Sequence, residues 1–223
     1  MKIIEPSHEI LDTISGIAGE GGRNMLRLIE LAARNCYKSE DAITCDSHGP
    51  FVTKIATVFK HESVIEHAHV SVRFICDRGV THEMVRHRLA AYSQESTRYC
   101  NYSKDKFGSE ITVIRPEWVK LDNNGNPLNN DYAARSWIDA MKVAELEYLK
   151  LLKLGWSAQQ ARSVLPNSLK TEIIMTCNLR EWQHVFRMRC STKAHPQMQQ
   201  LMKPLLAEFQ QHLPELFKEI NPA

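Results

Sequence analysis

Most of the short motifs that identify a chemistry directly are missing from this sequence. Its six cysteines stand at least nine residues apart, so it has no Cys-x-x-Cys pair for a metal or redox site. The first residues carry no apolar core followed by a cleavage site, and no apolar run approaches the ~20 residues of a membrane span. We therefore expect a cytoplasmic protein with reduced thiols and no membrane partner.

The sequence also has little excess charge. Its 28 basic and 26 acidic residues leave a net charge of +2, and its pI is about 8.2. Proteins that bind nucleic acid usually show a stronger basic excess, so we expect no nucleic-acid partner. A hydrophobic content of 43% and a charged content of 24% are ordinary for a globular protein. A chain of 223 residues suits one domain, which we place at residues 1–223.

Hydrophobic periodicity predicts an α+β fold. Apolar residues recur at helical spacing in residues 22–37, 51–59, 80–88, 131–154, 157–165, 179–190 and 196–212. Apolar and polar residues alternate, as they do in strands, in residues 70–76, 111–114 and 171–177. Ser157 and Asn178 are the expected N-caps of the helices that follow them. Residues 61–67 are expected to form a loop or turn, and residues 122–127 have a loop composition.

The most informative segment is residues 86–99, which hold three arginines, a histidine, two serines and two tyrosines. Its only acid is Glu95. Arginine presents a planar fork of donors that matches phosphate and carboxylate oxygens, and serine hydroxyls and aromatic rings suit a planar phosphorylated molecule. The segment therefore indicates a nucleotide or dinucleotide site without a glycine-rich loop. The alternative is a solvated basic helix end followed by a loop.

The spacing within this segment is specific. Arg86-His87-Arg88 is followed after seven residues by Ser96, and then by Arg98-Tyr99. This pattern resembles the signature of the flavin-dependent thymidylate synthases. The resemblance implies reductive methylation of dUMP to dTMP, with methylenetetrahydrofolate as one-carbon donor, FAD as hydride carrier and NADPH as reductant.

Three further segments resemble blocks of the same family, in the same order. Residues 61–67 match a His-Glu-Ser/Thr stretch, in which His61 and Glu66 are expected to shape the FAD pocket. Residues 161–168 contain the Ala-Arg-x-x-Leu-Pro block, and residues 178–189 begin with the Asn-x-Arg block and reach a second arginine nine residues later. The resemblance implies a central, mostly antiparallel sheet flanked by helices, in a homotetramer with FAD at subunit interfaces.

The resemblance also implies which residues bind each ligand. Those implied for dUMP are Glu83, Arg86, Gln94, Ser96, Thr97, Arg98, Arg162 and Arg189. Those implied for FAD are Ser63, Arg86, His87, Arg88, Gln94, Asn178, Arg180 and His184. Arg189 is expected to be catalytic, as a cation that stabilises an enolate-like, N3-ionised uracil, and no cysteine nucleophile is expected. Three positions depart from the family: Glu83 and His184 stand where amides are frequent, and Gln94 stands where glutamate is frequent.

The two arginines of the last block are expected to point in different directions. Arg180 and Arg189 are nine residues apart, a rotation of about 900°, which places them on opposite sides of one helix. His184, four residues after Arg180, shares the face of Arg180. A site shared between subunits would reconcile these directions with one compact pair of ligands, in agreement with the implied tetramer.

Two other functions remain open from the residues alone. A non-catalytic module could use the arginines for nucleotide or RNA phosphates, and it would bind no flavin. A metal-dependent nucleotide hydrolase could use some of the ten histidines. However, His61 and His67 are six residues apart and diverge by about 600° on a helix, so we expect no metal site there.

Overall fold

The computed structural model describes residues 1–11 and 16–221 and has an α+β fold with an antiparallel sheet. The chain forms two compact units. Unit 1 comprises Met1–Ser7, Ile75–Met84 and Ser93–Ile173, and unit 2 comprises His8–Phe74, Val85–Tyr92 and Ile174–Ala223. One domain over residues 1–223 stays a prediction. Within the described residues, no helix has both the length and the apolar character needed to cross a bilayer.

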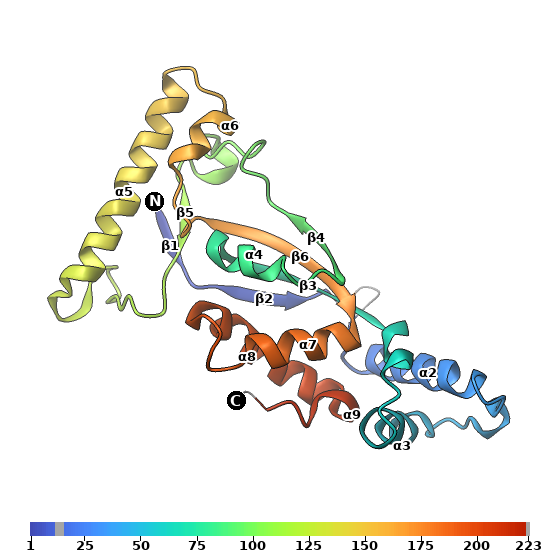
Figure 1. The fold of residues 1–223 in the computed structure, drawn as a ribbon. Helices are drawn as coiled ribbons and strands as arrows, with labels where there is room; N and C mark the ends of the chain where they lie inside the picture. Colours follow the sequence, from blue (N-terminus) through green and yellow to red (C-terminus); the bar gives the residue numbers. More distant parts are fainter. Residues whose placement is uncertain (12–15, 222–223) are drawn as a thin grey trace. The chain divides into compact units, whose positions relative to one another are not determined.

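Four strands form the larger sheet. They are β2 (Ser7–Ile10), β3 (His69–Asp77), β4 (Ala90–Gln94) and β6 (Lys170–Asn178), paired in the order β2-β3-β6-β4 (Figure 1). Burial alternates along β6, where Thr171, Ile173, Met175 and Cys177 are buried and the residues between them are half-buried. This period of two produces the predicted strand, because successive side chains point to opposite faces of a sheet. The expected strands at residues 70–76 and 171–177 are confirmed.

Unit 1 is built around a long helix and a small parallel sheet. Strand β1 (Lys2–Ile4) pairs in parallel with β5 (Thr112–Ile114). Helix α5 (Tyr132–Lys153) begins at Asp131, whose carboxylate accepts from the N–H groups of Ala133 and Ala134, and Gly155 follows it at φ 92°. The core comprises Tyr102, Ile111, Val113, Met141, Tyr148, Ala161 and Leu169. The predicted helix at residues 131–154 is therefore confirmed.

The remaining helices of unit 1 are short. They are α4 (Arg78–Met84), α6 (Ala158–Ala161) and the 3-10 segments Asp105–Phe107, Leu128–Asn130 and Arg162–Val164. The side-chain oxygen of Gln160 accepts from the N–H of Ser157, which confirms the predicted start of α6. Helical structure stops before Leu165, because the residue that precedes a proline is disfavoured in the helical conformation.

Unit 2 packs helices around an aromatic core. Its helices are α2 (Glu20–Asn35), α3 (His48–Thr53), α7 (Leu179–Arg189), α8 (Pro196–His212) and α9 (Pro214–Phe217), with a π-helical segment at Lys54–Val58 and 3-10 segments at Glu40–Ala42 and Glu62–His67 (Figure 1). The rings of Trp182, Phe186, Phe209 and Phe217 have centroids 5.0–5.9 Å apart. These contacts join α7, α8 and α9, and they place α7 firmly in the core.

Several predicted boundaries differ from the structure. Helix α3 begins at His48, before Gly49-Pro50, because proline is tolerated in the first turn of a helix. Residues 61–67 were expected as a loop or turn but form a 3-10 helix at Glu62–His67. Helix α4 ends at Met84, four residues before the predicted end. In α2, which was predicted over residues 22–37, the buried residues include Leu26 and Ala33, whereas Leu28 and Cys36 are exposed.

Candidate active site

In unit 2 the histidine of the Arg-His-Arg segment lies between two residues of α7. The ring of His87 is 6% exposed, and its Nε2 accepts from the Nε of Arg189 at 2.9 Å. Its Nδ1 lies 3.3 Å from Oε1 of Glu181. Because an arginine nitrogen always donates, Nε2 carries no proton, and the neutral ring holds its proton on Nδ1, facing the carboxylate. Glu181, His87 and Arg189 therefore form a continuous polar chain.

The surroundings of His87 keep its ring neutral. Burial lowers the pKa of His87 to about 4, and the positive charges of Arg189 and His184 act in the same direction. The rings of His87 and His184 meet edge to face, with centroids 5.6 Å apart. Burial raises the pKa of Glu181, while His184 opposes that rise. At neutral pH the histidine is thus an uncharged link between a buried acid and an arginine.

The same neighbourhood has the composition of a metal site. Ligand atoms of His87, Glu181 and His184 all lie within 4.8 Å of one another. However, both ring nitrogens of His87 already face partners, Arg189 on one side and Glu181 on the other. A metal ion would have to displace one of these partners, so the geometry fits a polar chain of Glu181, His87 and Arg189 better than a three-ligand metal site.

The other end of α7 brings together further residues expected to contact FAD. Arg180 pairs with Oε1 of Glu66 at 2.6 Å and with Oε2 of Glu62 at 3.0 Å. Both acids belong to the 3-10 helix Glu62–His67, which also contains Ser63. The side chain of Asn178 accepts from the N–H of Glu181 at 2.8 Å and caps α7, as predicted. A contact between Asn178 and FAD stays a prediction.

The three side chains of the Arg-His-Arg segment, residues 86–88, alternate between exposed and buried positions. His87 is buried, whereas Arg86 and Arg88 on either side of it are exposed. An exposed guanidinium keeps its hydration and remains available to a phosphate or carboxylate. The segment therefore supplies two accessible cations and one buried ring, a division that sequence spacing alone did not indicate.

In unit 1 two of the residues expected to contact dUMP line a small cavity. This cavity of about 220 Å³ is lined by Arg78, Thr97, Arg162, Ser163, Leu165, Pro166, Asn167 and Leu169. Nη1 of Arg162 donates to the hydroxyl of Thr97 at 3.3 Å. Arg78, the first residue of α4, was not predicted as a site residue, although it is a second cation on the same cavity. Its position just after a strand was the signal available in the sequence.

Gln94 is held inside unit 1 by two threonines. Its Nε2 donates to the hydroxyl oxygens of Thr81 at 3.0 Å and Thr171 at 3.3 Å. The Thr81 hydroxyl already donates to the carbonyl of Arg78, so its oxygen can only accept from position 94. An amide satisfies this requirement and a carboxylate does not, which gives a physical reason for the departure from glutamate.

The remaining predicted residues of unit 1 are Ser96, Arg98 and Glu83. The hydroxyl oxygen of Ser96 accepts from the N–H of Arg98 at 3.3 Å, and the Arg98 guanidinium lies over the ring of Tyr99. Glu83 is half-buried on α4. Glu95 was not predicted to have a role. Its carboxylate accepts from the Tyr102 hydroxyl at 2.9 Å and from Lys170 at 3.0 Å, so the one acid of the segment is locally neutralised.

The three buried thiols are poor candidates for a nucleophile. Cys76, Cys177 and Cys190 are buried, and burial raises the pKa of each, to about 11 for Cys190. A nucleophilic cysteine needs a stabilised thiolate, whereas these thiols stay protonated at neutral pH. A reaction without a covalent cysteine stays a prediction.

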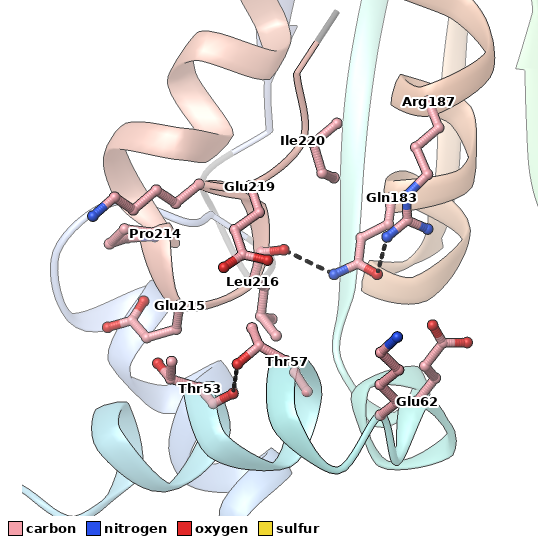
Figure 2. A pocket seen from close by; sticks show the side chains of 13 residues that line it. Thr53, Thr57, Glu62, Gln183, Arg187, Pro214, Glu215, Leu216, Glu219 and Ile220 are labelled. Carbon is pink, nitrogen blue, oxygen red and sulfur yellow. Dashed lines mark hydrogen bonds between the residues drawn. The ribbon is translucent and has the colours of Figure 1, made fainter.

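A larger cavity of unit 2 contains none of the predicted site residues. It measures about 660 Å³ and is lined by segments of α3, the π-helical segment, α7 and the region around α9 (Figure 2). Gln183 donates to the carbonyl of Leu216 there at 2.8 Å, and Arg187 and Glu62 lie at its edge. Its lining mixes cations and acids, so it does not select one class of ligand.

Comparison with known proteins places this geometry in context. Residues 23–215 match the family model described as Thymidylate synthase complementing protein. The chain is 30% identical over 201 residues to a flavin-dependent thymidylate synthase of Geobacter sulfurreducens, covering 87% of this chain and 81% of that protein. It is 31% identical over 216 residues to a protein of the same name from Clostridium tetani, covering 90% of this chain and 84% of that one.

Solved structures show a similar fold. The Helicobacter pylori enzyme ThyX, crystallised with FAD and dUMP, superposes with a TM-score of 0.68 at 22% identity, covering 87% of this chain and 93% of that one. The UMP/dUMP methylase PolB of Streptomyces cacaoi, bound with 5-Br dUMP, superposes with a TM-score of 0.73 at 22% identity, covering 98% and 96%. At this identity the likeness concerns the fold.

Proposed function

The chain belongs to the flavin-dependent thymidylate synthase family, and we propose that it methylates dUMP to dTMP with FAD as its cofactor. The family match over residues 23–215 carries this proposal. The contact between His87 of the signature and Arg189 of the last block supports it, because two matching segments far apart in sequence meet in unit 2.

We propose that Arg189 is the cation on which the chemistry depends. C5 of uracil is a weak nucleophile, and it becomes reactive when the ring acquires enolate character. A fixed guanidinium stabilises the negative charge that develops on the ring, and it acts most strongly when it is already oriented. The bond from Nε of Arg189 to His87 provides that orientation.

The residues of unit 2 suit a cofactor that carries a pyrophosphate. Arg86 and Arg88 are exposed, and Arg180, at the start of α7, pairs with Glu62 and Glu66 of the 3-10 helix that contains Ser63. Bound FAD would supply the hydride, which no side chain can provide. We propose that Ser63, Arg86, His87, Arg88, Asn178, Arg180 and His184 hold it, and a further FAD contact by Gln94 is proposed from the family resemblance.

The cavity of unit 1 suits the phosphate of the nucleotide. Arg78 and Arg162 bring two guanidinium groups to a space of about 220 Å³, and the Thr97 hydroxyl lies within reach of Arg162. Arginine matches phosphate oxygens in number and direction of donors. We propose that Arg78 joins Arg162 and Thr97 in binding the phosphate. The dUMP roles of Glu83, Arg86, Gln94, Ser96, Arg98 and Arg189 are proposed from the family resemblance.

The co-substrates, assembly and location also belong to this proposal. Methylenetetrahydrofolate would donate the one-carbon unit and NADPH the reducing equivalents. The chain would work in the cytoplasm as a homotetramer with FAD at subunit interfaces. The positions of Arg180 and Arg189 at opposite ends of α7 support a site to which more than one chain contributes.

The visible absorption spectrum after incubation with FAD and removal of excess tests the proposal. Flavin bands that bleach with NADPH and shift with dUMP are expected, followed by dTMP formation when methylenetetrahydrofolate is added. A colourless protein that binds polynucleotides in a salt-sensitive way would contradict it in favour of a phosphate-binding module. Nucleotide hydrolysis abolished by a chelator would contradict it in favour of a metal enzyme.

A further inference from the structure

Glu181 is a buried acid to which neither the sequence motifs nor the proposed reaction gives a role. It lies in the first turn of α7 and is 7% exposed. Burying a charged carboxylate is unfavourable unless other groups compensate it. The amino-terminal end of a helix favours negative charge, and His184 lies close enough to favour the charged form. The position is therefore built to hold a carboxylate.

The only ring nitrogen of His87 that faces Glu181 is Nδ1, at 3.3 Å. The other ring nitrogen, Nε2, accepts from Arg189 at 2.9 Å. A neutral imidazole carries one proton, and the group that accepts at one nitrogen decides which nitrogen holds it. An ionised carboxylate only accepts, so it requires the proton on Nδ1 and leaves Nε2 as the acceptor that Arg189 needs.

We propose that Glu181 is a positioning residue that fixes the tautomer of His87 and, through it, the orientation of the Arg189 guanidinium. The inference rests on the proposed role of Arg189 in dUMP methylation. Glu181 itself touches neither substrate nor cofactor. Its effect reaches the reaction only through the ring of His87 and the Nε of Arg189.

The exchange of Glu181 for glutamine separates this role from simple packing. Glutamine has the same shape, but its amide can either accept from Nδ1 or donate to it, so it no longer fixes the tautomer of His87. In the tautomer that carries the proton on Nε2, the ring cannot accept from the Nε–H of Arg189. Aspartate is shorter but remains an acceptor only. A positioning role therefore predicts more turnover in Glu181→Asp than in Glu181→Gln, whereas a role in packing predicts the reverse order.

The experiment measures kcat, KM for dUMP and FAD content in holoenzyme variants. We expect Glu181→Gln to keep FAD and to lose at least tenfold in kcat. In an Arg189→Lys background the same exchange should change kcat less than twofold, because lysine has no Nε–H to be oriented. Glu208→Gln is the matched control, since Glu208 also pairs with a histidine of unit 2, His8 at 2.6 Å, and it should behave as wild type.

Three outcomes would overturn the inference. The first is a wild-type kcat in Glu181→Gln, and the second is an equal loss of kcat from Glu181→Gln in both backgrounds. The third is a higher kcat in Glu181→Gln than in Glu181→Asp. If Glu181→Gln fails to retain FAD, the kcat of Glu181→Asp is compared with that of wild type, alone and in the Arg189→Lys background. This comparison still tests whether Glu181 acts through Arg189. Failure of the proposed function looks different, because Arg189→Lys alone would then keep full turnover, or the wild-type protein would form no dTMP.

Discussion

Within the Arg-His-Arg segment, neighbouring residues have opposite environments. Arg86 and Arg88 are exposed, while the ring of His87 is buried against Arg189 and Glu181. Sequence spacing identified the segment, and the family resemblance implied that all three side chains contact ligands. The sequence pattern could not show that His87 is buried, because α7 buries it, and α7 lies about ninety residues further along the chain. For the same reason Glu181 was not predicted.

The depressed pKa of His87 makes the stability of the protein depend on pH. The folded ring titrates at about pH 4 and an unfolded histidine near pH 6.5. Between these values the unfolded chain binds the proton and the folded chain does not, so stability falls as the pH is lowered from 6.5 towards 4, by up to about 3 kcal/mol. Glu181, whose pKa is raised, acts in the opposite direction.

Urea denaturation at pH 7 and pH 5 measures this effect. The free energy of unfolding of wild type relative to His87→Gln should decrease on acidification, because only wild type carries the buried titrating ring. His82→Gln, which replaces an exposed histidine of α4, should follow wild type at both pH values. A His87→Gln variant that also follows wild type would contradict the predicted shift.

A second prediction at this scale concerns Arg78. Replacing it with glutamine removes one of the two cations of the unit 1 cavity. We expect KM for dUMP to rise about tenfold or more, because a charge-assisted hydrogen bond contributes roughly 1.5–3 kcal/mol. FAD should stay bound. Steady-state kinetics with varied dUMP measure the change. Arg135→Gln, on an exposed position of α5, is the control and should not alter KM. An unchanged KM in Arg78→Gln would remove Arg78 from the site.

At the scale of elements, the longest and most regular segments were predicted best. Helices α5 and α8 and strands β3 and β6 have the expected positions, because each carries its period over nine or more residues. Strands β1, β2 and β4 have only three to five residues and were not predicted. Such short strands form through pairing with partners elsewhere in the chain, a tertiary effect that local pattern does not contain.

The cap of α7 can be tested separately from any contact with FAD. Asn178→Ala removes the acceptor for the N–H of Glu181 and should destabilise the protein by about 1 kcal/mol. Asn178→Asp keeps the acceptor and should retain wild-type stability. Thermal denaturation of the FAD-free protein measures both variants. Equal stability of Asn178→Ala and wild type would show that the cap contributes little to α7.

At the scale of the whole molecule, the chain divides the expected ligand contacts between its units. Most residues expected for dUMP lie in unit 1, and most residues expected for FAD lie in unit 2. The signature segment passes from unit 2 to unit 1 between Tyr92 and Ser93. The assignment of these residues to dUMP and FAD stays a prediction from the family resemblance, whereas the division of the chain into two units follows from its long-range contacts and was not predicted.

The proposed homotetramer gives a prediction at this scale. Light scattering after size exclusion should report a mass of four chains of 25.6 kDa each. If FAD sites are shared between chains, dilution that dissociates the assembly should release FAD and abolish turnover together. A monomer that keeps FAD and full turnover would contradict both the assembly and the shared site.

The burial of three of the six thiols also determines where a reporter group can be attached. Cys36 and Cys45 are exposed, Cys100 is half-buried, and the other three are inaccessible. The thiol of Cys45 donates to Asp46, which raises its pKa and slows its reaction with electrophiles. A maleimide dye added in limiting amount would therefore enter mainly at Cys36, at the end of α2. The wild-type sequence thus offers a fluorescence probe for unit 2 without removal of any native cysteine.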